Sequence, residues 1–150
     1  MLRMLKFYPE QVVRHWGKIG HAIENSLPPI IDSRKAGDRM NNILSSILAG
    51  KMEVQVFVVY ENERPIVYAI TSTAIIQPVD SEERELLLYS VYASRMLTRN
   101  IVLEGLELFK KYAKSQGCIA VSGYTNIEGI KRLFAAVGGG SSFTYLRLEV

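Results

Sequence analysis

Hydrophobic positions change their spacing along the chain, and each change predicts a new element of secondary structure. Residues 2–7 alternate between apolar and basic side chains, which predicts a short strand. Residues 9–27 place apolar side chains at helical spacing, and two prolines then end the helix. Residues 30–37 are predicted to form a loop, and a second helix is predicted over 38–50, beginning at an aspartate cap.

The middle of the chain takes the spacing of strands. Residues 54–60 and 66–77 are predicted strands joined by a polar turn. A further turn leads into 85–93, a nearly continuous apolar run that is typical of a buried strand. Because the connections between these strands are short, we expect an antiparallel meander.

A long amphipathic helix follows this meander. Thr98 or Asn100 is predicted to cap its start, and Gly117 ends it. Its apolar face carries Ile101, Val102, Gly105, Leu106, Leu108, Phe109, Tyr112 and Ala113.

The strand predicted at 118–124 follows this helix. A crossover helix usually joins parallel neighbours, so we expect this strand to lie parallel to 85–93. Thr125 or Asn126 is then predicted to cap a helix that three consecutive glycines end.

A final strand is predicted at 143–150. The complete order, βααβββαβαβ, predicts an α/β (α+β) fold with a mixed, mostly antiparallel sheet that has helices on both faces. We expect residues 1–150 to form a single domain, because no linker, repeat or low-complexity tract divides them.

Composition and charge narrow the function classes. The net charge is +3, yet no dense Lys/Arg tract is interleaved with aromatic residues, so nucleic-acid binding is not expected. Cys118 is the only cysteine, which excludes an internal disulfide and a thiolate zinc cluster. No secretion signal and no apolar run long enough to cross a membrane is present, so we expect a cytoplasmic protein without a membrane partner.

The turn between strand 85–93 and the long helix is the candidate site for an anion. A helix N-terminus presents unpaired backbone N–H groups and the positive end of the helix dipole. Arg95 and Arg99 flank this turn, and their guanidinium groups suit pyrophosphate; the alternative is that they are solvated loop charges. Thr98 and Asn100 are candidates to donate to phosphate, unless they serve only as caps.

The second half of the chain resembles the GNAT superfamily of acyl-CoA-dependent N-acetyltransferases. Residues 106–118, LELFKKYAKSQGC, are similar to the helix that follows the cofactor loop in that family. Asn126, followed by Leu133, Phe134 and Gly138, is similar to the late Asn, apolar, aromatic, Gly signature of the family.

The resemblance implies a division of labour within the sheet. Acetyl-CoA would lie in a V between the parallel strands, which splay at their C-terminal ends, and Asn126 would hydrogen-bond its pantetheine arm. The acceptor, an amine of a small molecule or a protein, would approach over the first two helices. The residues that the resemblance assigns to the cofactor loop are Arg95, Leu97, Thr98, Arg99 and Asn100.

Two positions depart from the pattern of the family. The stretch that matches its glycine-containing pyrophosphate loop, RMLTRNI at 95–101, has no glycine. Phe134 occupies the position of the tyrosine that often protonates the leaving thiolate, and a phenyl ring has no proton to give. Tyr124 is the nearest alternative hydroxyl and is our candidate acid, unless it is a packing residue with a solvated hydroxyl.

An acetyltransferase also needs a base to deprotonate its amine. Glu85 or Glu83 is our candidate; the alternative is a solvated carboxylate in a turn. Strict alternation along the strand predicts two faces, one with Glu85, Leu87, Tyr89 and Val91, the other with Leu86, Leu88, Ser90 and Tyr92.

Three functions therefore compete. The first is N-acetyl transfer from acetyl-CoA to an amine. The second is an inactive GNAT-like domain that serves as a structural or interaction component, such as a virion-associated phage protein, because an unpaired terminal strand would invite self-association or a protein partner. The third, a nucleic-acid-binding module, has only the net positive charge in its favour.

Overall fold

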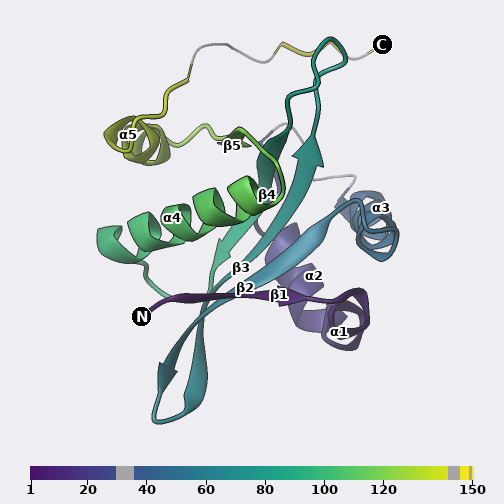
Figure 1. Cartoon of the computed structure of the whole chain (residues 1–150). Coiled ribbons are helices and arrows are strands. Elements are labelled where there is room, and N and C mark those ends of the chain that lie inside the picture. Colours follow the sequence, from purple (N-terminus) through teal and green to yellow (C-terminus); the bar gives the residue numbers. More distant parts are fainter. Residues whose placement is uncertain (30–35, 142–145, 149) are drawn as a thin grey trace.

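The core of the structure is a five-stranded sheet with the order β1-β2-β3-β4-β5. The computed structural model describes residues 1–29, 36–141, 146–148 and 150. Neighbouring strands pair antiparallel from β1 to β4, and β5 lies parallel to β4 (Figure 1), which confirms the predicted mixed sheet. The strands are β1 (Arg3–Phe7), β2 (Glu53–Glu61), β3 (Arg64–Ile76), β4 (Glu85–Ala93) and β5 (Ala120–Gly123).

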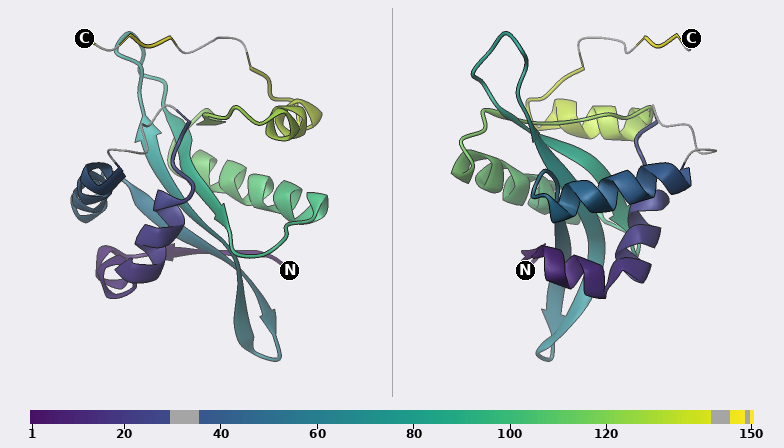
Figure 2. Two further views of the ribbon diagram at one scale, coloured as in Figure 1. Left: turned by 180° about the vertical axis from the view of Figure 1, so that it is seen from behind. Right: turned by 90° about the vertical axis from the view of Figure 1, so that its right-hand side faces the viewer.

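Helices cover both faces of this sheet, as predicted. Helices α1, α2 and α3 lie on one face and α4 lies on the other, with α5 on the α4 side (Figures 1 and 2). The helices are α1 (Pro9–Arg14), α2 (Trp16–Glu24), α3 (Ala36–Leu48), α4 (Arg99–Ser115) and α5 (Glu128–Ala136).

Each face has its own apolar core. The core under α4 is formed by Leu2, Phe57, Ala69, Leu86, Phe109 and Ala113. The core under α1, α2 and α3 is formed by Val12, Ile19, Ile23, Ile43, Ile47 and Val54. We call the two sides of the sheet the α4 face and the α1–α3 face.

The helix predicted over residues 9–27 is in fact two helices, and the prediction of a single one is wrong. His15 has φ −110° and ψ 22°, which ends α1 and begins α2. Val12 from α1 and Ile19 from α2 are both buried in the same core. The bend therefore wraps both apolar segments onto one face of the sheet.

The second helix begins earlier than predicted. It starts at Ala36, inside the predicted loop 30–37, so that part of the loop prediction is wrong. Residues 30–35 of this loop lie outside the described residues.

A β-bulge in β4 overturns the predicted alternation of its faces. Ser72 pairs with Ser90 but Thr73 pairs with Leu88, so Tyr89 is an extra residue on β4. Leu88 packs under α4, whereas Tyr89 packs in the core on the opposite face. Tyr92, which strict alternation places beside Leu88, instead contacts the ring of His21 on α2.

The C-terminal part also differs from the prediction. Helix α5 begins after Ile127, and neither Thr125 nor Asn126 caps it; the Thr125 hydroxyl instead accepts the Ile127 N–H at 3.1 Å. Of the predicted strand at 143–150, residues 142–145 and 149 lie outside the described part, and 146–148 are not in a strand.

Candidate functional site

The parallel strands β4 and β5 stop pairing partway along β4. Their register runs from Glu85 opposite Ala120 to Leu88 opposite Gly123, where β5 ends. Strand β4 continues to Ala93. Within the described parts of the chain, no strand pairs with this side of β4 beyond Leu88, so its backbone amides are free to bind a ligand that itself contains amide groups.

The N-terminus of α4 begins just beyond the free end of β4. Thr98 is its cap: the hydroxyl accepts the Ile101 N–H at 3.3 Å, and the carbonyl accepts the Val102 N–H at 3.1 Å. Thr98 is thus confirmed as one of the two predicted caps. In a helix capped in this way the first N–H groups, those of Arg99 and Asn100, have no partner within the helix and are available to an anion.

Arg95 is held in place at the start of this turn. Its guanidinium carbon lies 4.9 Å from the centre of the Tyr68 ring. The preceding residue, Ser94, donates its N–H to the Tyr68 carbonyl at 3.0 Å and its hydroxyl to the Val67 carbonyl at 2.8 Å. These contacts connect the turn to β3 and hold the Arg95 side chain against the sheet.

The turn reaches this geometry without glycine. Among the described non-glycine residues only Asn62 and Glu63, in the β2–β3 turn, have positive φ. The turn at 94–100 therefore lies in backbone regions that residues with side chains adopt without strain.

The remaining predicted residues separate into two groups. Tyr124 and Asn126 follow the C-terminal end of β5, and both are exposed. Because parallel strands end at the same edge of a sheet, they lie at the edge from which the α4 turn leaves. Leu97, Arg99 and Asn100 belong to that turn, Leu97 half-buried and the others exposed.

Glu85 lies apart from the residues at the end of β4 and the start of α4. It lies at the first position of β4, opposite Ala120, where the two strands are still paired. Tyr89 is four positions further along the strand, which corresponds to about 13 Å in an extended chain. The role of Glu85 as a base stays a prediction that the position of the side chain does not favour.

Sequence reasoning missed Tyr89, which occupies the bulge where β4 and β5 separate. Its ring is half-buried, and burial raises the pKa of its hydroxyl while the positive charge of Arg39 opposes this shift. Behind it the hydroxyls of Ser72 and Ser90 share a hydrogen bond between β3 and β4. The apolar run of β4 gave no signal for the bulge, because a bulge depends on the register of the partner strand.

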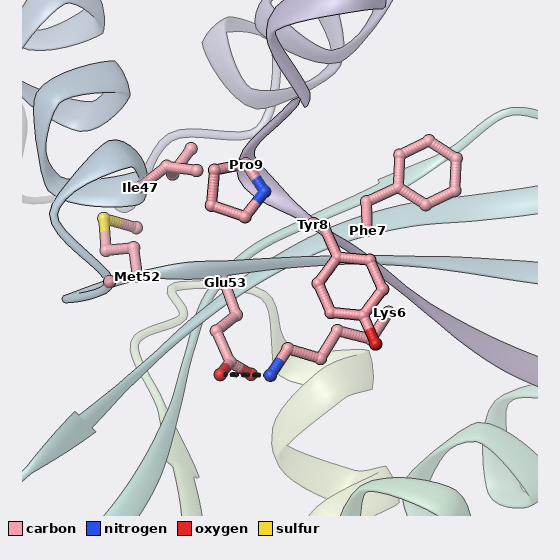
Figure 3. Close-up of a pocket in the computed structure, with 8 residues that line it drawn as sticks. Lys6, Phe7, Tyr8, Pro9, Ile47, Met52 and Glu53 are labelled. Atoms are coloured by element: carbon pink, nitrogen blue, oxygen red, sulfur yellow. Dashed lines mark ion pairs between the residues drawn. The ribbon is translucent and has the colours of Figure 1, made fainter. Parts of the chain in front are cut away.

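A separate hollow of about 120 Å³ lies at the start of β2 (Figure 3). Lys6 Nζ lies 2.9 Å from the Glu53 carboxylate, which also accepts a hydrogen bond from the Tyr112 hydroxyl of α4. Burial and the bond to Glu53 raise the pKa of Tyr112. Strand β3 separates this hollow from β4, and about 20 Å of helix separates Tyr112 from the α4 N-terminus. This polar cluster is therefore distinct from the β4–β5 site.

The described residues form neither a metal site nor a membrane-spanning helix. They contain no group of three or more His, Cys, Asp and Glu side chains arranged to hold a metal ion. None of the helices there combines the length and the apolar character that crossing a membrane requires.

Comparisons by sequence and by structure give different results. No protein-family profile and no curated protein matches the sequence. Solved structures do match over nearly the whole chain. A predicted acetyltransferase from Clostridium acetobutylicum, solved with acetyl-CoA, has a TM-score of 0.66 at 14% identity, covering 99% of this chain and 96% of its own.

Two other matches are an aminoglycoside acetyltransferase and AAC(6')-Iy. An aminoglycoside acetyltransferase from an uncultured soil sample has a TM-score of 0.69 at 13% identity, covering 100% of this chain and 99% of its own. AAC(6')-Iy, in complex with a bisubstrate analogue of CoA and acetylneamine, has a TM-score of 0.65 at 11% identity, covering 100% and 98%. This chain has the GNAT fold. The separation of β4 from β5 is thus the V expected of a GNAT fold, and the α4 turn is at its open end.

Proposed function

We propose that this chain is an N-acetyltransferase that moves an acetyl group from acetyl-CoA to an amine. The observation that carries the proposal is the free end of β4 beside the capped N-terminus of α4, with Arg95 fixed over Tyr68 at the same place. The anion site at the α4 N-terminus therefore lies next to a row of unpaired backbone amides on β4. A cofactor whose pyrophosphate is joined to an arm that contains amide groups requires this arrangement. The acetyltransferases of the same fold, one of them solved with acetyl-CoA, support this choice.

Different residues bind different parts of the cofactor. The N–H groups of Arg99 and Asn100 bind the pyrophosphate, and the guanidinium groups of Arg95 and Arg99 neutralise its charge. Thr98 fixes the first turn of α4, and the half-buried Leu97 directly precedes this cap. The free edge of β4 and Asn126 hydrogen-bond the pantetheine amides.

The chemistry follows from where the thioester would lie. When bound, acetyl-CoA supplies an activated acyl group whose carbonyl carbon is attacked by a neutral amine. A C–N bond forms, the C–S bond breaks, and the thiolate takes up a proton. Tyr124, at the end of β5, is our candidate donor of that proton. Glu85 lies too far along β4 for direct contact with the amine, so any transfer of the amine proton to it runs through water.

The test is a measurement of free thiol released from acetyl-CoA by the purified protein with a panel of primary amines. We expect thiol release that depends on the amine and that falls at least tenfold in Arg99→Ala. The matched control is Arg14→Ala on α1, which lies on the opposite face of the sheet from α4 and should retain activity. No release with any amine would contradict the enzymatic proposal and favour the inactive interaction component as the function.

A further inference from the structure

The α1–α3 face of the site, where an amine would meet the thioester, carries polar groups of its own. Ser122 of β5 lies opposite Leu87 of β4, one pair before the strands separate, and Tyr89 follows at the bulge. Leu88 points to the α4 face, so its neighbours Leu87 and Tyr89 share the α1–α3 face with Ser122. Two hydroxyl groups therefore lie beside the point where β4 and β5 part.

Ser122 has an unused hydrogen-bonding group at this point. Its hydroxyl oxygen is buried, and it has no hydrogen-bond partner among the described residues. Buried polar atoms are normally satisfied, and one without a partner is a place where a ligand or a water completes the bonding. The unsatisfied oxygen thus marks the α1–α3 face of the strand separation as a binding surface.

Arg39 brings a positive charge to the same surface. It lies on α3, and its neighbour Met40 packs in the same apolar core as Tyr89. Its positive charge acts on the Tyr89 hydroxyl and opposes the rise in pKa that burial causes. The guanidinium is exposed and forms no ion pair within the described parts of the chain.

We propose that the acceptor is an amine that also bears an anionic group, a carboxylate or a phosphate, and that Arg39 binds this group while Tyr89 and Ser122 line the path to the thioester. This inference rests on the proposed acetyltransferase function and adds the class of its acceptor. A guanidinium fork binds carboxylate and phosphate oxygens in pairs and repels a polycation. The site therefore selects for an amino acid or a phosphorylated amine and against a polyamine.

The test compares matched ligands that differ only in the anionic group. O-phosphoethanolamine is compared with ethanolamine, and L-phenylalanine with 2-phenylethylamine, by calorimetric titration into protein saturated with CoA, so that no turnover occurs. We expect at least one anionic member to bind ten- to a hundredfold more tightly than its partner, the range of a charge-assisted hydrogen bond. Arg39→Gln should remove this difference and leave the neutral amine unaffected, while Arg14→Gln should preserve it.

The outcomes separate the two proposals. If CoA binds but no anionic amine binds better than its partner, or if Arg39→Gln leaves the preference intact, the anionic acceptor is wrong and the acetyltransferase proposal stands. If CoA itself does not bind, the acetyltransferase proposal fails first. A merely structural role for Arg39 would weaken both members of each pair equally, which would also contradict the inference.

Discussion

The guanidinium group of Arg95 lies over the ring of Tyr68, with 4.9 Å between the guanidinium carbon and the ring centre. Arg95 precedes the cap of α4, and Tyr68 is the extra residue of a bulge between β2 and β3. The contact fixes the position of the Arg95 guanidinium over β3 before any ligand binds. Because an oriented side chain loses less entropy on binding, we regard Tyr68 as a positioning residue for the cofactor.

Replacing Tyr68 by leucine should therefore weaken acetyl-CoA binding, although Tyr68 acts through Arg95 and not by direct contact with the ligand. An exposed cation–π contact contributes about 0.5–1 kcal/mol, so the dissociation constant should rise about two- to fivefold. The chain provides a matched control in Tyr60, which lies on the same β2–β3 hairpin as Tyr68. The centre of its ring lies 5.3 Å from the guanidinium carbon of Arg3. Tyr60→Leu should leave the dissociation constant unchanged, and an equal loss in both variants would show that the effect is structural.

Thr98 is expected to stabilise helix α4 rather than to contribute directly to ligand binding. Its hydroxyl accepts the Ile101 N–H, so Thr98→Ala should lower the free energy of unfolding by about 1 kcal/mol. For a domain of this size that corresponds to a fall of about 2–4 °C in Tm. Thr98→Ser keeps the acceptor and should restore most of the loss. If serine is no better than alanine, the cap does not stabilise α4.

Stability above pH 10 should depend on Tyr112. Its pKa is raised in the folded protein, so above the ordinary tyrosine pKa of about 10 the folded state holds a proton that the unfolded state has lost. The free energy of unfolding should then fall as pH rises, by up to about 1.4 kcal/mol per pH unit. Below pH 10 this group causes no pH dependence.

Denaturant unfolding of the wild type and of Tyr112→Phe between pH 8 and 11.5 tests this account. The variant should be less stable at pH 8, because Glu53 loses a donor, and should lose less stability as the pH rises. Because burial also raises the pKa of Tyr89, part of the dependence of the free energy of unfolding on pH should remain in the variant. Tyr8→Phe, at an exposed position before α1, is the control. Identical slopes for wild type and Tyr112→Phe would contradict the assignment.

Ser122→Ala tests whether its hydroxyl is unsatisfied in the free protein. Removing a buried polar atom that has no partner should leave the stability unchanged or increase it. Ser90→Ala is the matched control, because its hydroxyl is buried but bonded to Ser72, and it should destabilise the chain. A loss of stability in Ser122→Ala comparable to that in Ser90→Ala would show that Ser122 has a partner and would remove one support for the acceptor surface.

The sequence predicted those features that local pattern decides. Strand β4, helix α4 and the cap at Thr98 follow from apolar spacing and from one side chain placed before the helix, and all three were found. The parallel pairing of β4 and β5 follows from the crossover helix between them.

Features that depend on distant residues were not predicted. The bulge at Tyr89 is set by its pairing with β3, and the bend at His15 by the need of Val12 and Ile19 to reach one core. The charge of Arg39 lowers the pKa of Tyr89 from fifty positions away in the chain, and no spacing rule relates the two residues. The proposed acceptor side of the site depends mainly on such long-range relationships, whereas the proposed cofactor side is formed largely by one continuous turn.

The most direct test of the central claim is a thermal melt with and without acetyl-CoA, on the wild type and on Arg95→Ala and Arg99→Ala. Ligand at a hundred times its dissociation constant should add about 2.7 kcal/mol to the free energy of unfolding. At 2–4 °C per kcal/mol this raises Tm by roughly 5–11 °C, and the rise should shrink in both arginine variants. No rise with millimolar acetyl-CoA, or an undiminished rise in both variants, would contradict a cofactor site between β4 and the N-terminus of α4.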